Sequence, residues 1–212
     1  MKCGEYFHIA LLSGLLVSKP ALATCPNPAE PGGQSVEGAS GWQCSSGSGG
    51  DGVPTGCPNV GDQCDDDSYY VGELGGEKIY ATSSDSEVSR SWNNGTENWS
   101  PTGFASTTNG PGNTDGLVNL SDSGAPYEAA EYCDDLTAHG HSDLYLPAKD
   151  ELHLFYNSGS PVAGVQTGGS NWYWASTENN TWYSWCEHLG DGNQVDTLKT
   201  DILLVRCVRR IE

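Results

Sequence analysis

The sequence predicts a mixed α+β fold, and three observations support this. Apolar residues recur at helical spacing in two stretches, over 126–139 and from 147 onward. Short runs rich in aromatic and β-branched residues follow over 172–177, 182–189 and 203–209, as expected for strands. A cysteine lies in the first of these helices and another in the last of these strands, which allows a disulfide between them.

The helix predicted over 126–139 has a well-defined buried face. Ala129, Cys133 and Leu136 recur at i, i+4 and i+7 on that face. Pro126 suits a first helical turn, and Gly140 is a natural stop. The stretch is therefore expected to pack its apolar stripe against the sheet.

A second helix is expected to begin near Pro147, with Leu152 and Phe155 on its buried stripe. Asp150 and Glu151 fall in its first turn, where carboxylates interact favourably with the helix dipole. We interpret these two acids as solvated residues that stabilise the helix, not as a general acid and base.

The last predicted strand, over 203–209, places its cysteine on an apolar face. Leu203, Val205 and Cys207 alternate with Arg206, so Cys207 points the same way as its apolar neighbours. Cys133 also points to the buried side of its helix. The simplest inference is a buried Cys133–Cys207 disulfide, which ties the first helix to the final strand.

The first 24 residues have the layout of a secretory signal peptide. A basic residue and a short apolar run precede small residues at Ala21 and Ala23, which suit cleavage before residue 24. The same segment also resembles a bacterial lipobox, in which Cys25 becomes a lipidated first residue and anchors the protein. Both alternatives stay open. We expect a bacterial protein that is secreted or displayed on the outer membrane.

Composition divides the remaining chain into a stalk and a domain. Residues 25–66 are rich in Gly, Pro and Ser, which favours a flexible or disulfide-pinned linker. Residues 67–212 have the size of one domain, and a further strand is expected over 78–82. Cys3 leaves with the signal peptide, so an odd number of cysteines remains, and one is lipidated, free or intermolecular. These remaining cysteines are Cys25, Cys44, Cys57, Cys64, Cys133, Cys186 and Cys207.

Charge and motifs restrict the chemistry. With 28 acidic against 9 basic residues, and a net charge of −19, the chain is poorly suited to nucleic acid. No CxxC pair occurs, and His139 and His141 have no third ligand at metal-site spacing. Asp65 to Asp67 lack the ligand spacing of an EF-hand. We therefore expect no metal, no cofactor and no catalysis.

Five ordered segments stand out: Tyr132–Cys133, Gly140–Leu152 (GHSDLYLPAKDEL), Tyr173–Glu178 (YWASTE), Asp191–Gln194 (DGNQ) and Val205–Arg209 (VRCVR). Together they resemble the DUF1566 family, also described as the Legionella collagen-like protein C-terminal domain family. The upstream stretches 102–110 and 112–114 match the pattern of the same family.

That resemblance implies a C-type-lectin-like fold, in which two helices pack on a small, twisted antiparallel sheet with long irregular loops. A disulfide from the first helix to the last strand is a feature of that fold. Trp174 belongs to the resemblance and is expected in the core. Of Trp182 and Trp185, the resemblance favours Trp185 as the one packed under the site, which leaves Trp182 as a candidate exposed aromatic.

Members of the family also resemble the target proteins of diversity-generating retroelements, in which mutagenesis varies codons for surface residues near the C-terminus. The segment 171–201 is dense in residues that such mutagenesis produces, and a plain Asn-rich loop region is the alternative. Cys186 would then be a variable residue. The candidate ligand-binding residues are Asn171, Trp172, Asn179, Asn180, Tyr183, His188, Asn193, Asp196 and Asp201.

The sequence thus predicts an exported recognition module that binds a protein or glycan ligand through the 171–201 face. A lectin-fold oxidase is an alternative, although such enzymes use paired cysteines and only Cys186 is unassigned. A structural role in an appendage or phage fibre is the other alternative. The oligomeric state stays open.

Overall fold

The computed structural model describes residues 52–159 and 162–211. The predicted signal peptide over 1–24 and Cys25 and Cys44 of the predicted stalk lie outside the described residues. No helix in the described ranges has the length and apolar character needed to cross a membrane.

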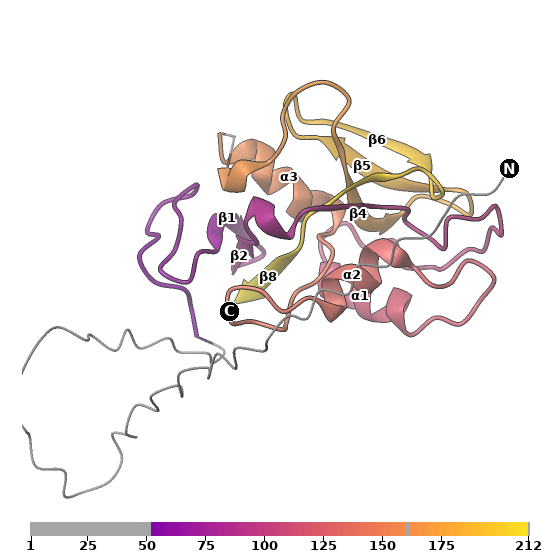
Figure 1. Ribbon diagram of the computed structural model, residues 1–212, viewed down its shortest axis with the longest axis horizontal. Coiled ribbons are helices and arrows are strands. Elements are labelled where there is room, and N and C mark those ends of the chain that lie inside the picture. Colours follow the sequence, from indigo (N-terminus) through magenta and orange to yellow (C-terminus); the bar gives the residue numbers. More distant parts are fainter. Residues whose placement is uncertain (1–51, 160–161, 212) are drawn as a thin grey trace, which may run out of the picture. The chain divides into compact units, whose positions relative to one another are not determined.

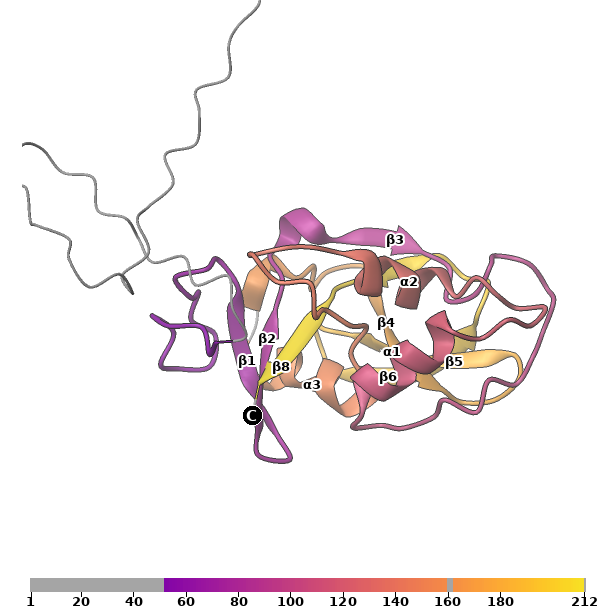
Figure 2. The same cartoon turned by 90° about the horizontal axis from the view of Figure 1, so that it is seen from below.

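The described chain is a mixed α+β structure with three α-helices and two sheets, so the predicted fold class is confirmed at this level (Figure 1). The helices are α1 (Gly110–Val118), α2 (Glu128–Asp135) and α3 (Lys149–Asn157). The smaller sheet has the order β1 (Tyr69–Leu74), β2 (Glu77–Ala81), β8 (Val208–Ile211), and its strands lie side by side in Figure 2. The larger has the order β3 (Val88–Arg90), β7 (Leu203–Val205), β4 (Trp172–Glu178), β5 (Tyr183–His188), β6 (Asn193–Leu198).

Strand β4 lies between two hydrophobic cores. Tyr173 and Ala175 face a core that includes Leu152 and Phe155 of α3. Trp174 faces the other core, together with the buried residues of α1 and α2. Figure 1 accordingly shows α3 on one side of β4 and the α1–α2 pair on the other. A strand buried on both faces is expected to carry a nearly continuous apolar run, as β4 does.

The predicted strands over 78–82, 172–177 and 182–189 are confirmed to within one residue at each end. The single strand predicted over 203–209 is wrong, because the chain leaves the larger sheet after β7 and joins the smaller one as β8. Arg206 lies at this crossing, where it is buried. Its guanidinium donates to the carbonyls of Thr82 and Ala163 and pairs with Glu87 at 2.6 Å.

Two helix expectations need correction. The helix predicted over 126–139 is shorter, because Leu136 adopts an extended conformation and the chain turns back between Ala138 and His141. Glu151 is not solvated: it is fully buried at the start of α3, where its carboxylate accepts from the Ala148 backbone N–H at 2.7 Å and pairs with Arg210. Burial raises the pKa of Glu151.

The predicted disulfide between Cys133 and Cys207 is present, and both residues are fully buried. It joins α2 to the segment between β7 and β8, across a sequence separation of 74 residues. The bridge therefore ties the C-terminal strands to the helical side of the molecule.

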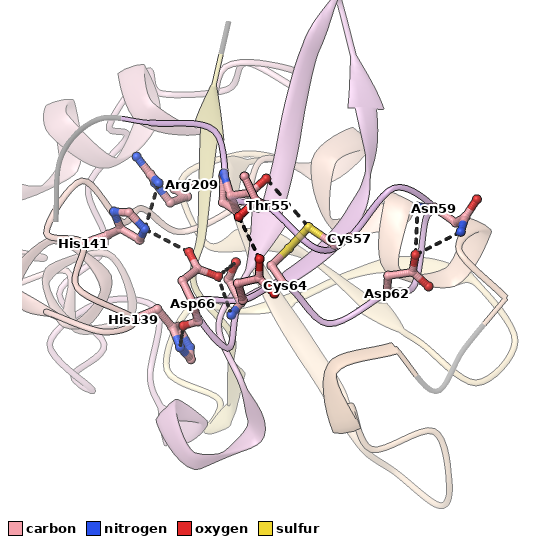
Figure 3. The surroundings of a disulfide bond; sticks show 12 residues. Thr55, Cys57, Asn59, Asp62, Cys64, Asp66, His139, His141 and Arg209 are labelled. Carbon is pink, nitrogen blue, oxygen red and sulfur yellow. Dashed lines mark hydrogen bonds and ion pairs between the residues drawn. A yellow bond between two sulfur atoms is a disulfide. The ribbon is translucent and has the colours of Figure 1, made fainter. Parts of the chain in front are cut away.

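A second disulfide, Cys57–Cys64, closes a short loop within the predicted stalk (Figure 3). This loop is bonded to the domain. The Asp66 carboxylate lies 3.0 Å from His141 Nε2, and the Asp66 carbonyl lies 3.0 Å from His139 Nδ1. The end of the predicted stalk thus packs next to β1.

Candidate functional site

The nine sequence-predicted ligand residues are all exposed or partly exposed, with only 15% of the His188 side chain accessible, and they form two groups. Trp172 pairs with His188 in the β4–β5 ladder, and His188 pairs with Asn193 in the β5–β6 ladder. The Trp172 and His188 rings are 5.5 Å apart. Together with Asn171, these residues form a group at the end of the sheet where β4 and β6 begin.

The second group lies at the opposite end of the same strands. It contains Asn179 and Asn180 in the β4–β5 turn, Tyr183 at the start of β5, Asp196 near the end of β6, and Asp201 in the turn after β6. Asn179 donates from its side-chain amide to Asp196 at 2.7 Å. Tyr183 and His188 are five residues apart in one strand, or about 17 Å, whereas Asn193 and Asp196 are three residues apart in β6, or about 10 Å. The predicted residues are therefore spread along the length of these strands.

Large exposed apolar side chains gather at this second end. Ile202 is 71% exposed, Trp182 52% and Leu198 37%. Leu198 lies opposite Tyr183 in the ladder. The backbone N–H of Lys199, which follows Leu198, donates to the Trp182 carbonyl at 3.0 Å. We call this surface the β5–β6 tip. It consists of Asn179, Asn180, Trp182, Tyr183, Asp196, Leu198, Asp201 and Ile202.

The sequence prediction missed Leu198 and Ile202 as surface residues. Apolar residues at strand ends are expected in the core, and no strand was predicted over β6. One signal was present: Ile202 is out of phase with the buried alternation of Leu203, Val205 and Cys207.

A buried ion pair supports the tip from below. Lys199 Nζ lies 2.5 Å from Glu178 Oε1, and both side chains are buried. Burial lowers the pKa of Lys199, and the neighbouring Glu178 opposes that shift. The backbone N–H groups of Thr102 and Gly103 also donate to the Glu178 carboxylate, each at 2.9 Å. The Glu178 carboxylate is therefore paired both with a cation from the turn after β6 and with backbone N–H groups of the loop that precedes α1.

The same ion pair fixes the long polar loop that precedes α1. Lys199 donates to the Ser100 carbonyl at 3.2 Å and lies over the Trp92 ring, 4.9 Å from its centroid. Trp92 is buried and donates from its indole to the Ala175 carbonyl at 2.8 Å. The loop is thereby bonded to both β4 and the end of β6, so the tip rests on an ordered base.

The turn that presents Trp182 is also held by hydrogen bonds. Asn180 Oδ1 accepts from the backbone N–H groups of Trp182 and Tyr183, at 2.9 and 3.1 Å. Such a side-chain-to-backbone turn fixes the chain without tertiary contacts. The Trp182 ring thus projects from a preformed hairpin.

On the α3 side, Trp185 packs against the core that contains Leu152 and Phe155 of α3. It is half-buried and lies opposite Asp196 in the ladder, with Lys149 Nζ 3.4 Å from its ring centroid. Next to it, Glu187 is fully buried, and His153 Nδ1 lies 2.7 Å from its carboxylate. Burial raises the pKa of Glu187.

Cys186 belongs to the core and not to the surface. It is buried in the same cluster as Trp174 and Val195, and it makes no disulfide within the described ranges. Burial raises the pKa of its thiol to about 12, so the sulfur is protonated at neutral pH. A substitution at this position would alter packing and would not present a new side chain.

The acidic run at 65–67 and the two loop histidines do not converge on one point. Thr55 donates to Asp65, and Gln63 donates to Asp67, so these two carboxylates have separate partners. In the described part of the chain, no group of three or more His, Cys, Asp or Glu residues is arranged to hold a metal ion.

Comparison with known proteins gives no assignment: no protein-family model matches the chain, and no curated protein matches it.

Proposed function

We propose that this chain is an exported recognition protein with a C-type-lectin-like domain, and that the β5–β6 tip binds a protein or glycan ligand. The observation that carries the proposal is the exposure of Trp182, Leu198 and Ile202 at one end of the sheet. Clustered apolar side chains on a soluble surface are typical of interaction sites.

The composition of the tip fits recognition. Trp and Tyr supply large contact areas at low entropic cost, and Asn and Asp supply adaptable hydrogen bonds. The ordered base formed by Glu178 and Lys199 limits the conformational entropy that binding must overcome. The arrangement favours binding over thiol chemistry, because Cys186, the unpaired thiol among the described residues, is buried and protonated.

Three features support the lectin-like and exported parts of the proposal. The Cys133–Cys207 bridge joins the first predicted helix to the C-terminal strands, as in that fold. The loop over 91–109 is long and irregular. Two disulfides are compatible with an extracellular location.

If the protein is a retroelement target, we expect the variable residues to be the five predicted ones that the tip contains: Asn179, Asn180, Tyr183, Asp196 and Asp201. The test is the DNA that flanks the gene. A reverse transcriptase and a near-copy of the 171–209 coding segment, differing at adenines, would establish diversification. Without them, the tip has one fixed specificity.

The function is tested by measuring binding of the fluorescently labelled protein to a glycan array and to intact bacterial and animal cells. We expect saturable binding that is lost in the Trp182→Ala/Ile202→Ala double variant. Tyr156→Ala is the matched control, because it removes an exposed aromatic residue on α3, away from the tip. Treating the cells with protease or glycosidase then identifies the ligand class. Equal binding by all three proteins would contradict the proposal.

A further inference from the structure

Strand β6 is the edge strand of the five-stranded sheet. It pairs with β5 over six residues, from Asn193 opposite His188 to Leu198 opposite Tyr183, without a register shift. Figure 1 shows β6 as the outermost strand on this side. A regular edge strand presents unpaired backbone N–H and C=O groups to the surroundings.

In the β5–β6 ladder, alternate residues of β6 direct their backbone N–H and C=O groups away from β5. The Lys199 N–H donates to the Trp182 carbonyl, whereas the Tyr183 carbonyl accepts from Asn179, on the β4 side. Because hydrogen-bonded pairs alternate in an antiparallel ladder, the backbone groups of Gln194 and Asp196 point away from β5. Outside the β5–β6 ladder, no hydrogen bond joins the backbone N–H of either residue to another described residue.

This edge lacks the usual features that prevent strand addition. Its sequence, NQVDTL, contains no proline and no lysine. Its only charged residue is Asp196, which is exposed. The edge also ends at Leu198 in the tip, so a strand paired to β6 would run towards Trp182.

From these observations we infer that β6 accepts an extended segment of a partner protein as an additional strand, with a Lys or Arg side chain next to Asp196. This inference rests on the proposed function and assigns its partner class. The backbone of the partner supplies hydrogen bonds to the outward groups, and its basic residue complements a chain of net charge −19.

A second copy of this chain is a poorer occupant of the same edge. Two β6 strands related by a two-fold axis, in the register that uses the outward groups of Gln194, Asp196 and Leu198, place Asp196 opposite its own counterpart. Like charges directly opposite each other destabilise a strand pair. The acidic surface therefore favours a basic segment.

The test uses synthetic peptides of about ten residues, enough for one strand, that alternate valine with lysine or with glutamate. A third peptide keeps the lysines but carries N-methyl groups on alternate backbone nitrogens. Binding is measured by fluorescence anisotropy. We expect the lysine peptide to bind at least about tenfold more tightly than the other two. Equal binding of the lysine and N-methylated peptides, or binding of neither, overturns the inference.

Two variants distinguish the contribution of the Asp196 backbone N–H to peptide binding from that of the Asp196 side chain. Asp196→Ala removes the carboxylate and keeps the outward N–H, whereas Asp196→Pro removes both. Proline is tolerated at an edge position whose N–H faces solvent, so the β5–β6 ladder is retained. We expect Asp196→Pro to bind the lysine peptide at least about tenfold more weakly than Asp196→Ala does. Equal affinity of the two variants contradicts strand addition.

Hydrogen exchange of the wild-type protein tests the inference without any variant. The lysine peptide is expected to slow amide exchange at Gln194 and Asp196, and to leave the amides of Val195 and Thr197 unchanged, because those already face β5. Unchanged exchange at Asp196 under saturating peptide overturns strand addition. Cell binding that needs Trp182 but tolerates Asp196→Pro would leave the proposed function intact and reject only this inference.

Discussion

The Lys199 ammonium group lies 2.5 Å from the Glu178 carboxylate, and both groups are almost completely removed from solvent. The pair connects the end of β4, the turn after β6 and the loop that contains Thr102 and Gly103. It therefore links the β4 and β6 sides of the tip to the loop on which the tip rests.

Breaking this pair should be costly. Lys199→Met leaves the Glu178 charge buried without its cation, and we expect the free energy of unfolding to fall by about 3–5 kcal/mol in chemical denaturation. The Glu178→Gln/Lys199→Met double variant should lose less, because no buried charge remains. Asp191→Asn is the control, since Asp191 is 64% exposed in its pair with His188, and it should change stability little. A double variant less stable than Lys199→Met would contradict this account.

The two disulfides should contribute different amounts to the free energy of unfolding. In the chain-entropy model, removing Cys133–Cys207, with its separation of 74 residues, costs about 4 kcal/mol. Removing Cys57–Cys64, with a separation of 7, costs about 2 kcal/mol. Paired Cys→Ala variants, measured by urea denaturation, test this order. A larger loss from the shorter loop would contradict it.

Sequence patterns predicted the parts of the fold that bury a periodic apolar stripe. Cys133 in its predicted helix and Cys207 in its predicted strand were each expected to point to the core, which was enough to pair them. Trp174 was likewise expected in the core and is there. Helix α1 was missed, because its sequence GPGNTDGLV has low helix propensity. Its cap from Asn109 and the buried hydrogen bonds of Asn113 and Thr114 stabilise it instead.

The site was only partly predictable. Composition marked 171–201 as rich in surface polar residues, but it could not show that Trp172 and Tyr183 belong to opposite ends of the sheet. That division depends on the β4–β5–β6 register, which follows from long-range pairing. The charged residues Glu151, Lys199 and Arg206 were also unpredictable as buried groups, because each is buried only through a partner distant in sequence.

Two tryptophans should respond oppositely to substitution. Trp174→Ala removes a fully buried side chain and should destabilise the protein by about 3–5 kcal/mol. Trp182→Ala removes an exposed one and should change stability by no more than about 0.5 kcal/mol. Thermal unfolding of the two variants distinguishes them. A large loss from Trp182→Ala would show that this ring stabilises the fold.

The N-terminal disulfide loop should detach at low pH. Although burial raises the pKa of Asp66, hydrogen bonds from Ser68 and the neighbouring His141 lower it below its usual 3.8 (Figure 3). The folded state then binds fewer protons than the unfolded state, so this stabilisation is present above pH 3.8 and is lost as the pH falls through the lowered pKa. Amide exchange of residues 55–68 should accelerate below pH 3.8, and Asp66→Asn should abolish that dependence. If amide exchange in this loop has the same pH dependence in the wild-type protein and in Asp66→Asn, the assignment is contradicted.

Photocrosslinking on intact target cells tests the central claim most directly. One protein carries a benzophenone side chain at position 202 in the tip, and a second carries it at position 156 on α3; both positions are exposed in the native protein. The account predicts a discrete crosslinked cell-surface product from position 202, competed by excess unlabelled protein, and none from position 156. A product from position 156 alone, or equal products from both, would contradict recognition through the β5–β6 tip.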